Sequence, residues 1–156
     1  MPSQVLSTQA AEVAWVRFLR AHAAVTRELS ARLEAAHGLT LSDYDVLVQL
    51  YTAPDRALRR VDIARAVLLT ASGITRLLDG LERAGWVEKR SCEHDARVSY
   101  AVLTDAGVQK FEAAQAAHRA DIEELFGCRF SAEEREQLAD LLGRLPLAET
   151  SSACSA

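Results

Sequence analysis

The chain has 156 residues, 49% of them hydrophobic and 26% charged, and its net charge is −4. This size and apolar content suit one domain over residues 1–156, and its few prolines and glycines favour helices. Its apolar runs are too short to cross a bilayer, and we expect no secretory signal. Three scattered cysteines argue against a disulfide framework, so we expect a cytoplasmic protein that contacts no membrane.

A long first helix is predicted over residues 9–36, after a loose start at residues 1–8. Its apolar stripe is spaced by threes and fours, and Gly38 follows as a C-terminal stop. The stripe consists of Trp15, Phe18, Leu19, His22, Val25, Leu29, Leu33 and Ala36.

A second helix is predicted to begin at Ser42, whose hydroxyl caps it, with Asp45 three residues later. Leu41, just before this cap, is placed to pack on Val46. The helix ends before the next proline, and we expect the polar residues 55–59 to be a connection.

A pair of helices is predicted next, over residues 60–67 and 71–84. Thr70 caps the second of them, Gly85 ends it and Trp86 follows as a hydrophobic contact. The side chains expected to point inward are Ile63, Val67, Ile74 and Leu77, with the small Ala64 where the two helices approach.

Two strands, 86–90 and 98–103, are predicted after the helix pair, joined by a polar loop. Thr104 caps a further helix, and Ser131 with Glu134 forms the capping box of a last one. We expect residues 149–156 to be a flexible tail. The fold class is therefore mainly α with a small β-wing.

Charge is distributed unevenly along the chain. Residues 56–100 hold nine Lys and Arg against six acids, a net +3, which leaves −7 for the rest. Phosphate attraction depends on charge within about 8 Å at physiological salt, so a basic segment on an acidic body can bind nucleic acid.

The helix pair and the ribbon together predict duplex DNA binding through residues 42–103. Short hydroxyls and an arginine at the start of the second helix suit phosphates and base edges, and basic residues line the ribbon. These side chains are Thr70, Ser72, Thr75 and Arg76, followed by Lys89, Arg90 and Arg97. A helix pair by itself could also serve only to pack the core, and the glycine usual in the turn of a helix-turn-helix is absent. The basic ribbon that follows the pair is therefore what favours DNA binding.

The run LLTASGITRLLDGLERAGWVEKRSCEHDARVSYAVLTDAG resembles the winged helix-turn-helix of the MarR family of bacterial transcriptional regulators. The matching features are Thr75-Arg76, Leu81-Glu82, Gly85, Asp95-Ala96-Arg97, Leu103-Thr104 and Gly107. The likeness covers about residues 9–146. It implies a transcriptional regulator that binds a palindromic operator as a homodimer, a repressor relieved by a small aromatic or phenolic ligand, at the bacterial nucleoid.

The resemblance also implies individual roles. Thr70, Ser72, Thr75 and Arg76 would contact the major groove. Arg97 would enter the minor groove, Arg90 would meet the backbone, and Asp95 would orient the wing through an ion pair. The family often has a second arginine where this chain has Ala96, which narrows the contact expected of the wing.

Residues 9–36 and 104–146 are expected to be dimerisation helices, because their apolar stripes need burial against a second copy or within one chain. A ligand pocket using Trp15, His22 and Tyr44 is one interpretation of the polar and aromatic groups near these stripes. Ordinary packed side chains are the other.

Alternative functions centre on the run Cys92-Glu93-His94-Asp95. Cys92 lies beside basic residues that could lower its pKa, which would suit a redox-responsive regulator. A metal or catalytic site is a weaker alternative, because no second ligand pair at a suitable spacing follows, and we expect no cofactor and no enzyme. A winged domain that contacts only protein is a further alternative, which salt dependence would distinguish.

Overall fold

The computed structural model describes residues 2–67, 71–91 and 98–145, with side chains from residue 9 onward except those of residues 71 and 72. The elements within these residues are α1 (Pro2–His37), α2 (Leu41–Thr52), η1 (Pro54–Arg56), β1 (Ala57–Arg59), α3 (Arg60–Ala66), α4 (Ala71–Arg83), β2 (Val87–Ser91), β3 (Ser99–Leu103), α5 (Asp105–Leu125), η2 (Gly127–Arg129) and α6 (Ala132–Leu142). The predicted fold class, mainly helical with a small β-wing, is confirmed. The predicted tail, 149–156, lies outside the described residues.

α1 is longer than predicted. Residues 2–8 continue the helix, so the expected loose start is wrong. Pro2 suits a first helical position, because its missing N–H would have no partner in the helix there. At the other end Gly38 adopts φ +63°, and its N–H donates to the carbonyl of Glu34 at 2.8 Å, which confirms the predicted stop.

α2 is capped by Thr40 and not by Ser42. The Thr40 hydroxyl accepts the Asp43 N–H at 3.1 Å, and the Asp43 carboxylate accepts the Thr40 N–H at 2.9 Å. Both threonine and serine are followed three residues later by aspartate, so the local pattern fits either start. With the start at Thr40, Leu39 and Tyr44 are both buried in the core, and this burial favours Thr40 over Ser42 as the cap.

The segment predicted to be a polar connection contains a strand. After the short helix η1, residues Ala57–Arg59 of β1 pair with β3, so the sheet has the antiparallel order β1-β3-β2. Three residues are too few to show an alternating pattern in the sequence. The two strands that were predicted are present within one residue of their expected bounds.

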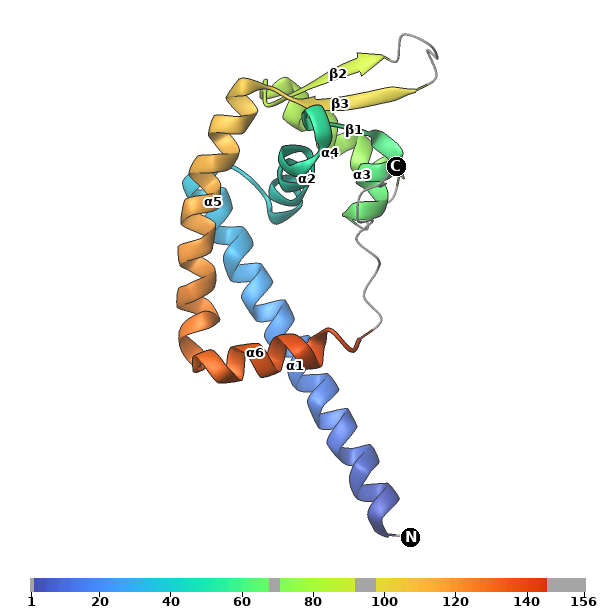
Figure 1. Cartoon of the computed structure of the whole chain (residues 1–156), viewed down its shortest axis with the longest axis vertical. Coiled ribbons are helices and arrows are strands. Elements are labelled where there is room, and N and C mark those ends of the chain that lie inside the picture. The colour runs from blue at the N-terminus through green and yellow to red at the C-terminus, as the bar shows by residue number, and fades with distance from the viewer. Residues whose placement is uncertain (1, 68–70, 92–97, 146–156) are drawn as a thin grey trace.

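One hydrophobic core joins the sheet and α2–α4 to α5 and the C-terminal half of α1. Its largest fully buried side chains are Phe111, Leu33, Leu39, Leu47, Leu50, Ile63, Leu78 and Val46. Figure 1 shows α5 running beside the C-terminal half of α1, whereas the N-terminal half of α1 extends away from the body.

Arg32 links α1 to α5 outside this core. Its Nη1 lies 2.9 Å from Asp121 Oδ1 and 3.0 Å from Glu124 Oε2, and its Nε lies 3.0 Å from Glu28 Oε1. The hydrogen bonds to Glu124, Asp121 and Glu28 raise the pKa of the guanidinium. In return, the hydrogen bond and the positive charge of Arg32 lower the pKa of the Glu124 carboxyl. The two long helices are thus joined by charge as well as by apolar packing.

Candidate nucleic-acid interface

α4 is sharply amphipathic. Ile74, Leu78 and Leu81 recur at intervals of three and four residues and are buried in the core. Thr75 and Arg76 lie between them in sequence and are exposed to solvent. The exposed side of α4 therefore starts with a hydroxyl and a guanidinium, both suited to base edges and phosphates.

The remaining residues predicted for this helix are only partly covered by the structure. Thr70 lies outside the described residues, and Ser72 lies on α4 without a described side chain. Their predicted contacts with the major groove stay predictions.

α3 packs beneath α4 as a helix-turn-helix requires. Ile63 is fully buried, and Ala64 and Val67 pack against the same core as Ile74. The half-buried Leu77 also packs against this core, so the four side chains expected to point inward do so. The small Ala64 lets the two helices approach closely, which fixes the exposed side of α4 relative to the rest of the chain.

The C-terminus of α4 is fixed by backbone hydrogen bonds. Gly85 adopts φ +77°, its N–H donates to the Glu82 carbonyl at 2.9 Å, and the Trp86 N–H donates to the Leu81 carbonyl at 3.0 Å. This pair of bonds is the Schellman arrangement, which needs a residue that tolerates a positive φ. The predicted stop at Gly85 is confirmed.

The strands β2 and β3 form the stem of the wing (Figure 1). Lys89 and Arg90 are exposed on β2 and lie opposite Ala101 and Tyr100 on β3. Arg90 pairs with Glu88 at 3.1 Å between two exposed side chains, an interaction of little strength that a phosphate could replace. The predicted tip residues, Asp95 and Arg97, lie outside the described residues.

Several of the basic residues counted in the sequence already have acidic partners. Arg59 binds Asp62 in a bidentate ion pair, with its Nε 2.7 Å from Oδ2, and Arg56 lies 3.8 Å from Asp105. Within the described residues, by contrast, no ion pair engages Arg76 or Lys89. The same holds for Arg60, Arg65 and Arg83, so the positive charge of the winged region comes mainly from basic residues that no described acidic side chain pairs with.

The residues proposed for a ligand pocket lie in two different environments. Trp15 and His22 are exposed on α1, where each ring lies about 6 Å from that of Phe18 (6.1 and 6.2 Å). Tyr44 is buried on α2, with its ring 5.6 Å from Phe111 and 4.6 Å from His118. A single chain therefore does not show these three side chains as one group, and the pocket stays a prediction.

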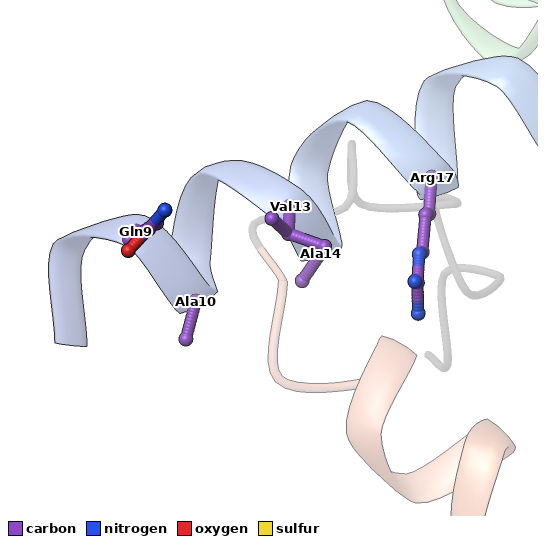
Figure 2. Close-up of a pocket in the computed structure, with 5 residues that line it drawn as sticks. All are labelled: Gln9, Ala10, Val13, Ala14 and Arg17. Carbon is purple, nitrogen blue, oxygen red and sulfur yellow. The ribbon is translucent and has the colours of Figure 1, made fainter. Parts of the chain in front are cut away.

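The depression on the exposed part of α1 is lined by Gln9, Ala10, Val13, Ala14 and Arg17 (Figure 2). All five side chains come from one helix, which cannot enclose a ligand by itself. This surface contains none of the three residues predicted to bind a ligand.

His118 on α5 is a buried polar side chain, with 7% of its surface exposed. Its Nδ1 has no hydrogen-bond partner among the described residues. Burial lowers the pKa of its imidazole, and Asp121 opposes this shift. An imidazole with a lowered pKa and an unsatisfied nitrogen therefore lies beside Tyr44, where α2 meets α5.

The alternative sites receive no support from the described residues. Cys92 and the run that follows it lie outside them, and among described residues no cluster of His, Cys, Asp and Glu could hold a metal ion. Cys128 is exposed and reduced, with its Sγ donating to the Glu124 carbonyl at 2.9 Å. No described helix is both long enough and apolar enough to cross a membrane.

Comparison with known proteins agrees with this geometry. The model of the MarR family matches residues 37–98, from the end of α1 to the wing. The uncharacterized HTH-type transcriptional regulator YdgJ of Bacillus subtilis is 30% identical over 121 residues, covering 78% of this chain and 72% of that protein. The HTH-type transcriptional repressor YetL of the same organism is 32% identical over 111 residues, covering 71% and 66%.

A solved structure is similar along most of the chain. Sco3205, a MarR family transcriptional regulator from Streptomyces coelicolor crystallised in complex with DNA, superposes with a TM-score of 0.79 at 25% identity. The match covers 85% of this chain and 82% of that one. The likeness therefore includes the helices outside the winged region.

Proposed function

We propose that this chain, which belongs to the MarR family of winged helix-turn-helix transcriptional regulators, binds a palindromic DNA operator as a homodimer and represses transcription there. The observation that carries this proposal is the surface of α4. Its apolar side is fully used in the core, while Thr75 and Arg76 are exposed at the end that would enter the major groove.

The wing extends the same surface. Lys89 and Arg90 on β2 would contact phosphates beside the groove that α4 occupies, with Arg97 and Asp95 at the tip as the family resemblance implies. The complex of the similar protein Sco3205 with DNA supports DNA binding, and the similarity to the transcriptional repressor YetL supports repression. A regulator of this kind needs no catalytic group, and we place it in the cytoplasm.

The homodimer is supported by apolar side chains that one chain leaves uncovered. Several lie on the extended part of α1, and others lie on α5 and α6 or just after these helices. The side chains concerned are Val13, Trp15, Val16, Phe18, Leu19, Ile122, Phe126, Leu141 and Leu145. A second copy related by a twofold axis would cover them and place two α4 helices about 34 Å apart, one turn of DNA.

Relief of repression by a small aromatic ligand is the finer part of the proposal. The unsatisfied Nδ1 of His118 beside Tyr44 supports it, because a planar acid could supply a partner where the winged region meets α5. Trp15 and His22 would contribute only if the partner chain brought them near. Screening phenolic acids for release of operator DNA tests this part, and no release by any of them would contradict it.

Selection of bound duplexes from a random pool tests the DNA-binding proposal. We expect an inverted repeat, and affinity that falls steeply as salt rises. Arg76→Ala should weaken binding to the selected operator by roughly tenfold or more, since a good arginine contact to a base is worth about 1–3 kcal/mol.

Arg83→Ala is the matched control. Arg83 lies two turns further along the same side of α4, also exposed, with its Nε donating to the Asp79 carbonyl at 3.1 Å. Because the N-terminal part of a recognition helix reads bases, this variant should lose less affinity than Arg76→Ala. Equal affinities of both variants and the wild type would contradict the proposed docking.

A further inference from the structure

α4 and α5 are joined by a short backbone junction, which we call the α4–α5 junction and define as Gly85, Trp86, Thr104 and Gly107. The backbone of Trp86 forms hydrogen bonds with both helices, through its N–H to α4 and through its carbonyl to the cap of α5. The N–H donates to Leu81 of α4 at 3.0 Å, and the carbonyl accepts the N–H of Thr104, the cap of α5, at 3.1 Å. The end of one helix is thus bonded directly to the start of the other.

The Thr104 hydroxyl makes a second connection. It accepts the Gly107 N–H at 3.0 Å, which caps α5, and it donates to the Gly85 carbonyl at 2.7 Å. A hydroxyl can donate one hydrogen bond and accept another, so the Thr104 hydroxyl bridges Gly85 at the end of α4 and Gly107 in the first turn of α5. An ordinary N-cap needs only the first of these bonds.

Gly107 allows the two segments to approach this closely. A Cβ added to it would collide with the carbonyl oxygen of Trp86 and lie 2.8 Å from Cδ1 of Leu103. The oxygen belongs to the backbone, so it cannot move aside as a flexible side chain would. The φ angle of Gly107 is not positive, so a glycine is required there by the lack of room for a Cβ and not by the backbone conformation.

Lys110 covers the junction from α5. Its Nζ lies 4.7 Å from the centre of the Trp86 ring, a cation–π distance. The ring itself is half-buried against the core. Trp86 is therefore held through its N–H, its carbonyl and its ring.

We propose that Thr104 and Gly107 are positioning residues that fix the angle between α4 and α5, and so set the half-site spacing that the dimer accepts. This inference rests on the proposed function. If α5 belongs to the dimerisation helices, the angle at the junction determines where each α4 lies relative to the twofold axis. α4 is about 20 Å long at 1.5 Å per residue. A rotation of about 10° would move its far end by about one base-pair step of 3.4 Å.

The test measures affinity for three duplexes: the selected operator, and the same operator with one base pair added or removed between its half-sites. We expect the wild type to bind both altered duplexes at least about tenfold more weakly. Thr104→Val removes both hydroxyl bonds and should reduce this discrimination to about threefold. Thr104→Ser retains the hydroxyl and should restore it.

Thr52→Val is a matched control from α2. Its hydroxyl also donates to a backbone carbonyl, that of Val48 at 2.9 Å, but it lies away from the junction, so discrimination should be unchanged. Gly107→Ala provides a second variant if Thr104→Val does not fold by circular dichroism. Gly107→Ala should change the half-site spacing that the protein binds best, because the added methyl group separates α5 from Trp86.

The affinities for the three duplexes decide the inference. Reduced discrimination in Thr104→Val, or a moved optimum in Gly107→Ala, supports it. An equal loss of affinity on all three duplexes, with the ratio unchanged, shows only stabilisation and overturns it, as does a wild type indifferent to spacing. Failure of the wild type to bind any inverted repeat contradicts the proposed function instead.

Discussion

The winged region and the terminal helices differ in how completely one chain buries their apolar side chains. On α4, the side chains of Ile74, Leu78 and Leu81 are almost fully buried. On the terminal helices, Trp15 of α1 is 58% exposed and Leu141 of α6 is 53% exposed. The core of the winged region is closed within one chain, with Leu33 of α1 and Phe111 of α5 as part of it, whereas the outer parts of the terminal helices present surfaces that a partner could cover. This difference suggests that folding of the winged region and assembly of the protein can be perturbed separately.

The largest expected effect comes from opening the core of the winged region. Leu78→Ala should lower the free energy of unfolding by about 2–5 kcal/mol, because it removes a fully buried side chain and leaves a cavity. Urea unfolding followed by circular dichroism measures this. Leu141→Ala, measured on dilute protein, is the control and should cost far less, and equal losses would remove the distinction between the two regions.

The second effect concerns assembly. Leu141→Glu places a charge where the proposed dimer buries a leucine, so the dimer dissociation constant should rise by roughly a hundredfold or more. Val61→Glu is the matched control, since Val61 is 57% exposed but lies on α3 in the winged region. Sedimentation velocity over a dilution series should show dissociation for the first variant alone. An unchanged dimer in Leu141→Glu would exclude α6 from the interface.

The smallest effect lies where the two regions meet. Burial lowers the pKa of His118 below its usual 6.5, so between that lower pKa and 6.5 the unfolded chain binds more protons than the folded one. The free energy of unfolding should therefore fall as pH falls through this window. His118→Phe should flatten the part of the curve that lies below pH 6.5. Identical slopes for variant and wild type would show that the ring titrates normally.

The sequence predicted those features that depend on local pattern. The stop at Gly85, the caps at Thr104 and Ser131, and both long strands are present as expected. The inward positions predicted for Ile74 and Leu77 were enough to orient α4, and Thr75 and Arg76 are exposed as this orientation requires.

The errors arose where tertiary contacts decide. The start of α2 was wrong because Thr40 and Ser42 have the same local signal, and the burial of Leu39 distinguishes them. β1 was missed because a three-residue strand exists only through pairing with β3. The surroundings of Tyr44 could not be predicted either, because they depend on α5, more than sixty residues away in sequence.

The number of chains bound to one operator duplex tests the central claim most directly. Sedimentation equilibrium of the complex with the selected operator should give two chains per duplex, and a duplex holding a single half-site should bind far more weakly. One chain per duplex, with equal affinity for the single half-site, would contradict the account of this protein as a twofold DNA reader.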